Sequence, residues 1–372
     1  MKILQLGKFY PIRGGVEKVM WDLTRGLAAR GVSCDMLCAA GDGEKENRII
    51  PLGETGRVIV VPALFKAAAT MIAPQMISWL RKHRNDYDII HIHHPDPMAC
   101  LVLWLSGYKG RVILHWHSDI LSQRFLLTLY RPLQSWLIRR AERIVGTTPV
   151  YVAESPWLQK VQDKVTYVPI GIEPVPVDEA GAARIREKYK GKKLVFSLGR
   201  LVPYKGFAYL VEAARYLDDG YHILIGGSGP LRGELQERID ALGLTDRVTL
   251  LGYLEDAAIP ALFSACDVFV LSSVMKTEAF GIVQIEAMSA GKPVIATRIP
   301  HSGVSWVNED GVSGVNVAPE NALELANAMH FICNSSENYR TLTDCARKRF
   351  TELFTSGHMI DGIMKLYGLS DE

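Results

Sequence analysis

The 372-residue sequence has few features of a secreted, disulfide-stabilised or membrane-spanning protein. It has no positively charged start followed by an apolar run, and no window approaches about eighteen uninterrupted apolar residues. Its six cysteines lie mostly inside apolar runs without zinc-ligand spacing, so we expect reduced, buried thiols. These absences favour a cytoplasmic protein.

The chain also has little net charge, but that charge is unevenly distributed. The net charge is +2, yet residues 1–170 hold 22 Lys and Arg against 14 Asp and Glu, and the rest hold 20 against 26. The arginines of the basic half are interleaved with Leu, Ile and Trp, without a dense basic run or a nucleic-acid motif. We therefore expect no nucleic-acid partner, and an anionic membrane face or a diphosphate-bearing acceptor fits better.

Short apolar runs alternate with amphipathic helical stretches along nearly the whole chain. KILQLG, DIIHIHH and RVILHWHS belong to a first series, and KLVFSLG, YHILIGG and CDVFVLSS belong to a second. A Pro- and Gly-rich break separates the two series. The pattern predicts an α/β protein with two Rossmann-like, doubly wound domains, residues 1–170 and 191–350, joined by a linker at 171–190. Ligands bind beyond the carboxyl ends of such strands, so two facing domains would place a cleft between those edges.

Two loops are candidates for holding an anion. Gly14 and Gly15 follow the first predicted strand and open a helix, although a plain turn would look the same. Arg200 and Lys205 share a Pro-containing loop after KLVFSLG and could clamp a diphosphate, although a solvated pair of charges is the alternative. Neither GGVEKV nor the later GGSGPLR has the third glycine of a dinucleotide-binding loop.

The segment TEAFGIVQIEAMSAG follows the predicted strand DVFVLSS. Its Phe280 and Gly281 would offer backbone amides to phosphate oxygens at the start of a helix. Glu278 and Glu286 are carboxylates, so they suit the hydroxyls of a sugar and a ribose rather than a phosphate. The alternative is that Glu278 caps the helix and Glu286 is a solvated helix residue.

Histidines gather at the strand ends of the first half. RVILHWHS ends its strand at His117, with Asp119 following as a helix cap or an orienting group. The histidines of DIIHIHHPDP invite a metal interpretation, but no further ligand spacing supports it. We expect His93 and His94 to line the cleft, with Asp119 as a further candidate, and no metal to be bound; a core or capping role for His117 stays open.

Taken together, these motifs resemble glycosyltransferase family 4, the retaining enzymes with the GT-B fold. The resemblance rests on GGVEKV, HWHSD, GRLVPYKGF and EAFG with its following glutamate, in the expected order along essentially the whole chain. It implies that Arg200 and Lys205 hold the donor diphosphate. It also implies that Glu278 contacts the transferred sugar and that Glu286 contacts the ribose.

The resemblance further implies a retaining sugar transfer from a nucleotide-diphosphate sugar without a cofactor or a divalent ion. Gly15 would approach the donor from the opposite domain, His117 would reach the reacting centre, and residues 351–372 would pack back on the first domain. GKFYPIRGGVEKV, TTPVYVAESPWL and HSGVSWVNEDGVSGVNV resemble bacterial enzymes that build O-antigen and related surface polysaccharides. GDP-mannose is the favoured donor and a UDP-sugar the second, with a polyprenyl-diphosphate-linked glycan as acceptor.

Two apolar and basic stretches bear on membrane contact. ALFKAAATMIAPQMISWLRKHR and RFLLTLYRPLQSWLIRRAER place Arg, Lys and Trp beside long aliphatic faces. Each stretch suits either an amphipathic helix on anionic lipid or a Rossmann helix with one face in the core. The positive charge of residues 1–170 favours peripheral contact with the inner face of the cytoplasmic membrane. Two other functions stay open, namely a GT-B sugar-nucleotide epimerase and a non-catalytic nucleotide-sugar-binding protein.

Overall fold

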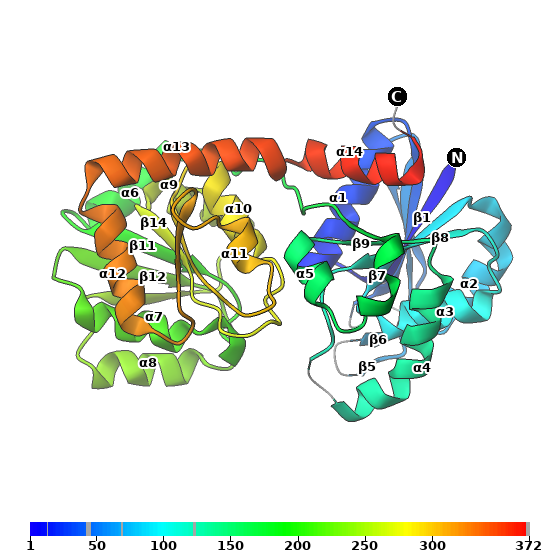
Figure 1. The fold of residues 1–372 in the computed structure, drawn as a ribbon, viewed down its shortest axis with the longest axis horizontal. Helices are drawn as coiled ribbons and strands as arrows, with labels where there is room; N and C mark the ends of the chain where they lie inside the picture. The colour runs from blue at the N-terminus through cyan, green and yellow to red at the C-terminus, as the bar shows by residue number, and fades with distance from the viewer. Residues whose placement is uncertain (13, 42–45, 68–69, 122–123, 370–372) are drawn as a thin grey trace. The chain divides into compact units, whose positions relative to one another are not determined.

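The computed structural model describes residues 1–12, 14–41, 46–67, 70–121 and 124–369, which fold into two compact units. Unit 1 comprises Met1–Gly171 and Ser356–Glu372, and unit 2 comprises Ile172–Thr355. Each unit has its own sheet with helices packed on it (Figure 1). The α/β pattern of the sequence therefore appears twice.

Unit 1 is built on an eight-stranded sheet of order β10-β9-β8-β7-β1-β2-β4-β3, parallel except for β3. The strands are β1 Lys2–Tyr10, β2 Ser33–Ala40, β3 Arg48–Leu52, β4 Gly56–Val61, β7 Ile89–His94, β8 Arg111–Trp116, β9 Arg143–Gly146 and β10 Val165–Tyr167, with a separate hairpin of β5 Phe65–Ala67 and β6 Thr70–Ile72. The helices are α1 Gly15–Ala29, α2 Gln75–His83, α3 Pro97–Ser106, α4 Arg124–Arg140, α5 Pro149–Glu154 and α14 Ser356–Tyr367, with 3-10 turns η1 Arg84–Asp86 and η2 Gln159–Lys164.

Unit 2 is built on six parallel strands of order β13-β12-β11-β14-β15-β16, the strand order of the dinucleotide-binding fold. The strands are β11 Lys193–Leu198, β12 Tyr221–Gly226, β13 Val248–Gly252, β14 Val268–Leu271, β15 Val294–Thr297 and β16 Gly314–Val317. The helices are α6 Glu179–Lys188, α7 Phe207–Ala213, α8 Arg232–Ala241, α9 Ile259–Ala265, α10 Ile282–Ser289, α11 Val304–Val307, α12 Ala322–Cys333 and α13 Ser336–Leu353, with η3 Pro203–Lys205, η4 Ala214–Tyr216 and η5 Asp256–Ala258.

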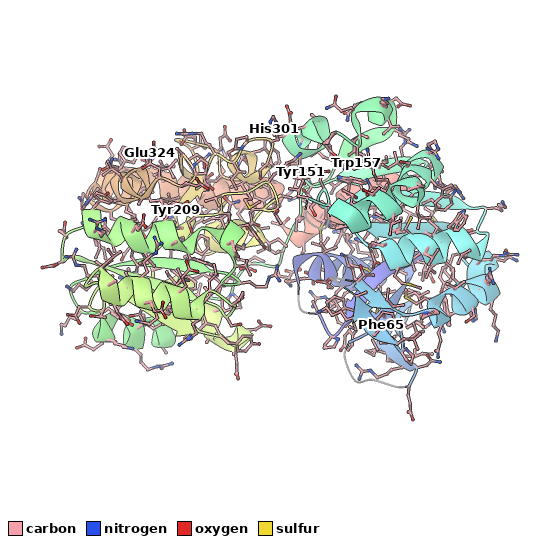
Figure 2. The ribbon with its side chains drawn as sticks, turned by 90° about the horizontal axis from the view of Figure 1, so that it is seen from below. Phe65, Tyr151, Trp157, Tyr209, His301 and Glu324 are labelled. Carbon is pink, nitrogen blue, oxygen red and sulfur yellow. The ribbon has the colours of Figure 1, made fainter. Side chains whose placement is uncertain are left out.

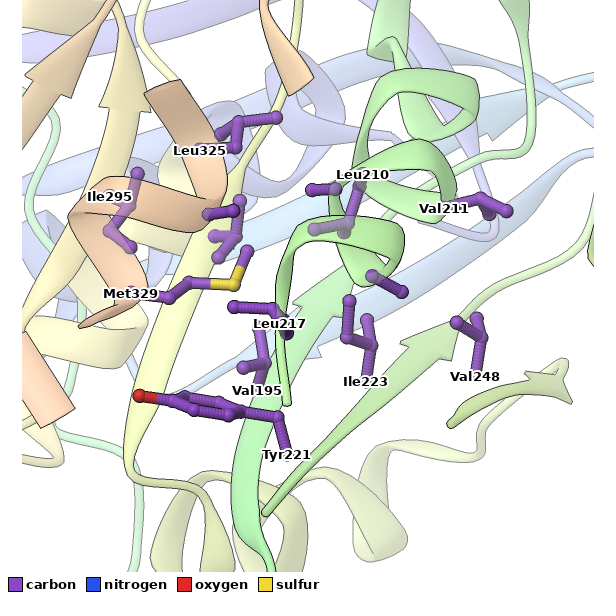
Figure 3. Close-up of a cluster of buried hydrophobic side chains, with 14 of the residues drawn as sticks. Val195, Leu210, Val211, Leu217, Tyr221, Ile223, Val248, Ile295, Leu325 and Met329 are labelled. Carbon is purple, nitrogen blue, oxygen red and sulfur yellow. The ribbon is translucent and has the colours of Figure 1, made fainter. Parts of the chain in front are cut away.

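The core of unit 2 follows from strands that are apolar on both faces. Val195 on β11, Ile223 on β12 and Ile295 on β15 lie in one buried cluster with Leu210 of α7 and Met329 of α12 (Figure 3). All five side chains are at most 1% exposed. Near-continuous Val, Ile and Leu runs are what a parallel sheet covered on both faces requires. The carboxyl ends of the strands are thus held by a close-packed scaffold.

The strand order reverses between β1 and β7 in unit 1, and between β11 and β14 in unit 2. At such a point the loops leaving neighbouring strands turn to opposite faces of the sheet, which opens a crevice at the carboxyl edge. The histidines and Gly14 lie near the first reversal point, and Lys205 and Glu278 lie near the second.

Three sequence-based boundaries differ from the structure. All but the first residue of the segment 171–190, expected as a linker, belongs to unit 2, and the segment contains α6, whose N-cap Asp178 accepts from Gly181 N at 2.8 Å. The change to unit 1 falls at Ser356 rather than at residue 351, since α13 continues to Leu353. The first amphipathic stretch is helical only in α2, and its earlier part holds the β5–β6 hairpin. Among the described residues, no helix is long and apolar enough to cross a membrane.

Candidate functional site

Three loops meet at the carboxyl edge of the unit 2 sheet. The loops after β11 and β12 are joined by hydrogen bonds from Leu201 N to Ser228 O (2.9 Å) and from Leu231 N to Leu201 O (3.1 Å). On the other side, Val274 N in the loop after β14 donates to Tyr204 O at 2.8 Å. Because backbone atoms make these bonds, the three loops form one continuous surface at the reversal point.

Gly206 allows two of these loops to approach closely. It has φ of 66°, and a Cβ at this position would lie 2.1 Å from the carbonyl oxygen of Ser272. The Ser272 hydroxyl in turn donates to the carbonyl oxygen of Lys205 at 3.0 Å. The backbone of Lys205 is therefore fixed on the loop after β14.

Lys205 and Glu278, predicted to hold the diphosphate and the sugar, form an ion pair with each other. Lys205 Nζ lies 2.5 Å from Glu278 Oε2, and each side chain is 11% exposed. The Ser273 hydroxyl donates to the same carboxylate oxygen at 2.9 Å, and the Ser302 hydroxyl donates to the Glu278 carbonyl at 2.5 Å. An ammonium group has three N–H donors, so Lys205 keeps donors for a second anion beside Glu278.

Phe280 and Gly281 stand at the start of α10. Gly281 is the N-cap, has φ of 75°, and has no side chain to cap the helix. The Phe280 ring is buried edge-on against Phe354, and its carbonyl accepts from Gln284 Nε2 at 2.7 Å. Among the described residues, neither the Phe280 nor the Gly281 amide donates to a protein acceptor. The two amides can therefore donate to an anion at the positive end of this helix.

The other predicted donor-binding residues are divided between the units. Arg200 has an exposed side chain on the loop after β11, and Glu286 is half-buried on α10. Gly14 and Gly15 belong to unit 1, as the N-cap and the first residue of α1. A Cβ on Gly14 would lie 2.3 Å from Glu17 Oε2, so the glycine leaves room for that buried carboxylate.

His117 lies at the carboxyl edge of unit 1, immediately after β8. Its backbone N–H donates to His94 O at 3.1 Å, and its Nε2 lies 2.9 Å from His93 Nδ1. His93 Nε2 lies 2.8 Å from Gln5 Oε1 on β1. His117 is 5% exposed, and both His93 and Gln5 are fully buried. The side chain at the strand end is thus supported by residues of two neighbouring strands.

The buried histidines of unit 1 are neutral at pH 7. Burial lowers the pKa of His91, His93 and His117 well below 6.5, and neighbouring imidazoles lower it further. Burial also lowers the pKa of His94 and His115 to about 3. Each ring therefore has one N–H donor and one lone-pair acceptor.

The structure corrects the expectation that His93 and His94 line a cleft, because both are buried. Strand alternation sends them to opposite faces of the sheet. His93 supports His117, whereas the His94 ring stacks on Trp116 with centroids 3.8 Å apart. Asp119 is also buried, and its carboxylate accepts from Trp116 Nε1 at 3.0 Å and from the Ser155 hydroxyl at 2.7 Å. Asp119 therefore holds the loop after β8 in place.

Ring nitrogens of His91, His93 and His115 lie within 4.8 Å of one another, which raises the question of a metal. The three rings are stacked, with interplanar angles of 8 to 27°. The lone pair that binds a metal lies in the ring plane, so nearly parallel rings direct their lone pairs side by side and not at one point. A metal would require these rings to rotate and His93 to give up its bonds to Gln5 and His117.

Sequence reasoning missed several residues of these sites. Ser273 and Ser302 hold Glu278, the 227–229 loop supports the loop after β11, and Gln5 and Tyr367 support His93 and His91. One signal was available for Gln5, since a polar residue in the middle of the buried strand KILQLG needs a hydrogen-bond partner. Tyr367 gave no such signal, because its partner Gln5 is 362 positions away.

Both halves of the chain match models of glycosyltransferase families. Residues 13–175 match Glycosyltransferase Family 4, and residues 181–349 match Glycosyl transferases group 1. The chain is 34% identical over 371 residues to the O-antigen chain mannosyltransferase C of Escherichia coli, covering 99% of this chain and 98% of that protein. It is 30% identical over 362 residues to the D-rhamnosyltransferase WbpZ of Pseudomonas aeruginosa, covering 96% and 93%.

Solved structures agree with this assignment at the level of the fold. Anabaena HepE in complex with UDP has a TM-score of 0.80 at 22% identity, covering 99% of this chain and 100% of that one. WaaG, a glycosyltransferase involved in lipopolysaccharide biosynthesis, has a TM-score of 0.71 at 17% identity, covering 99% and 100%. The predicted α/β fold class is confirmed. The chain therefore belongs to glycosyltransferase family 4 and is a hexosyltransferase with the GT-B fold.

Proposed function

We propose that this glycosyltransferase transfers mannose from GDP-mannose to a lipid-linked glycan in the synthesis of O-antigen or a related bacterial surface polysaccharide. The observation that carries the proposal is the 34% identity, over nearly the full length of both chains, to a protein named O-antigen chain mannosyltransferase C. A UDP-sugar is the second candidate donor. The D-rhamnosyltransferase relative adds a third sugar to test, because D-rhamnose is the 6-deoxy form of D-mannose.

The donor diphosphate binds at the carboxyl edge of unit 2 in this proposal. Arg200, Lys205 and the amides of Phe280 and Gly281 hold its oxygens, which is electrostatic stabilisation where negative charge grows as the sugar leaves. Glu278 accepts from a hydroxyl of the transferred sugar and Glu286 from the ribose. The transfer retains the anomeric configuration, with the departing phosphate acting as base, and needs no divalent metal or other cofactor.

The acceptor binds unit 1 at the inner face of the cytoplasmic membrane. Two observations support this placement, namely the excess of Lys and Arg in residues 1–170 and the exposed apolar side chains of unit 1. Leu64 is 71% exposed, Phe65 is 58% exposed, and Leu129 on α4 is 68% exposed. Phe65 lies on the β5–β6 hairpin (Figure 2). Apolar side chains beside basic ones suit an anionic lipid surface. Flotation of the protein with anionic vesicles at low salt, lost at high salt, tests this contact.

A titration of donor binding tests the proposed donor and its site together. GDP-mannose should bind more tightly than UDP-glucose, and Glu286→Ala should weaken GDP-mannose binding about tenfold because it removes a charged acceptor for the ribose. Isothermal titration calorimetry measures both quantities. The matched control is Glu237→Ala on the exposed face of α8, which should bind like the wild type. Tighter binding of UDP-glucose would contradict the donor, and an unchanged Glu286→Ala isotherm would contradict the site.

A further inference from the structure

A continuous set of hydrogen bonds links the last helix of unit 1 to His117. Tyr367 Oη on α14 lies 2.5 Å from His91 Nδ1 and 3.0 Å from Gln5 Nε2. Gln5 Oε1 lies 2.8 Å from His93 Nε2, and His93 Nδ1 lies 2.9 Å from His117 Nε2. Each of these five side chains is at most 5% exposed, so water does not compete for the bonds.

The orientation of the Gln5 amide follows from its partners. Its nitrogen faces two atoms that can accept, Tyr367 Oη and the more distant Cys34 Sγ at 3.8 Å. Its oxygen faces one ring nitrogen, that of His93. In the structure the Gln5 amide nitrogen therefore donates to Tyr367 Oη, and the amide oxygen is left to accept from His93.

This orientation determines the proton positions along the rest of the set. Gln5 Oε1 can only accept, so the proton of neutral His93 is on Nε2 and its Nδ1 is a lone pair. His117 must then donate to His93 from Nε2. Because His117 is also neutral, its Nδ1 is a lone pair, and this atom is buried without a hydrogen-bond partner among the described residues.

We propose that Gln5 is a positioning residue that, through His93, holds His117 in the Nε2–H tautomer, so that His117 Nδ1 accepts a hydrogen bond from a hydroxyl of the substrate. The inference rests on the proposed role of His117 in sugar transfer. A buried acceptor without a partner costs free energy, and a substrate hydroxyl that donates to it removes that cost. In the opposite tautomer, His117 Nδ1 would carry the proton, and a substrate hydroxyl could then only accept a hydrogen bond from it.

Tyr367 contacts both Gln5 and His91 through its hydroxyl. Its hydroxyl accepts from the Gln5 amide, which leaves its own proton to donate to His91 Nδ1, so removal of the hydroxyl leaves a Gln5 N–H without its nearer acceptor. Tyr367 belongs to α14, which packs on α1 of the same unit. The C-terminal helix is thereby connected to the proton position on His117.

Nitrogen-15 NMR of histidine-labelled protein tests the tautomer directly and needs no activity. In the wild type, His117 should show a protonated Nε2 and an unprotonated Nδ1, with its signals assigned by their loss in His117→Gln. Gln5→Leu should mix the two tautomers of His93 and His117 and lower kcat about tenfold or more, with little change in KM for the donor. Tyr367→Phe, which keeps the shape of the ring, should do the same to a smaller extent.

Gln134→Leu is the matched control, because Gln134 is also a buried glutamine bonded to a histidine of the same sheet, His94, but lies outside this set. It should leave the His117 spectrum and the transfer rate unchanged. A protonated Nδ1 on wild-type His117 would overturn the inference, and so would a Gln5→Leu variant with an unchanged spectrum and kcat. If no donor supported transfer while the spectra behaved as expected, the proposed function would fail and the tautomer assignment would stand.

Discussion

Replacing Lys205 by methionine is expected to lower the free energy of unfolding of unit 2 by about 3–5 kcal/mol and to weaken GDP-mannose binding at least about tenfold. The stability loss arises because the Glu278 carboxylate is only 11% exposed. Once the ammonium is gone, the Ser273 hydroxyl is its one remaining side-chain partner within the described part of the chain. In the proposed donor site, the affinity loss arises because a charged donor to the diphosphate is removed. Urea unfolding and calorimetric titration measure the two effects separately.

The double variant Lys205→Met with Glu278→Gln separates the two roles of Lys205. Neutralising the carboxylate removes the unpaired buried charge, so stability should recover substantially, whereas GDP-mannose binding should stay weak. The matched control is Lys190→Met, which breaks the exposed pair with Glu187 and should change stability by less than about 1 kcal/mol. If donor binding recovered together with stability, Lys205 would be a structural residue only.

The free energy of unfolding of unit 1 is expected to fall by several kcal/mol between pH 7 and pH 5.5. The five buried histidines have folded-state pKa values below 6.5, two of them at about 3, so the unfolded chain binds more protons than the folded one in this range. Their stabilisation is therefore fully present above about pH 6.5 and is lost as the pH falls, by up to about 1.4 kcal/mol per pH unit for each ring. Tryptophan fluorescence can follow this unfolding, since six of the seven tryptophans belong to unit 1 and only Trp306 to unit 2.

His115→Phe tests the origin of the pH dependence. Neither ring nitrogen of His115 has a hydrogen-bond partner among the described residues, so phenylalanine can replace it without leaving a polar group unpaired. The slope of unfolding free energy against pH should fall by up to about 1.4 kcal/mol per pH unit, with the full effect below about pH 6. Thr147→Val, which removes another buried polar atom of unit 1 without a hydrogen-bond partner among the described residues but no titratable group, should leave the slope unchanged. An equal slope in the wild type and His115→Phe would contradict the explanation.

Sequence patterns were sufficient to locate predicted site residues that lie soon after a strand. Lys205 and Glu278 each lie a few residues beyond an apolar run, and strand ends meet at one edge of a parallel sheet, so their shared location was predictable. Their direct ion pair was not, because it depends on the packing of loops 73 positions apart in the sequence. The need for glycine at position 206 was also not predictable, because it depends on the close approach of Ser272 O in the loop after β14.

The histidines show the limit of strand periodicity. Alternation along a strand places His91 and His93 on one face and His94 on the other, but it does not tell which residues of the next strand lie opposite. The register of β7 and β8 pairs His93 with His115. Their imidazoles therefore stack in the interior, and His93 is buried. Tyr367 contacts this group from a helix whose position depends on the complete fold of unit 1.

A transfer assay tests the proposed function most directly. The purified protein would be incubated with GDP-mannose, GDP-rhamnose or UDP-glucose, each with and without a polyprenyl-diphosphate-linked saccharide in anionic vesicles. The glycolipid product would be read by mass and its anomeric configuration by NMR. We expect one hexose to be added from GDP-mannose, only when the acceptor is present, and with the α configuration of the donor retained. Addition from UDP-glucose alone, an inverted linkage, or isomerisation of the nucleotide sugar without an acceptor would contradict the proposed function.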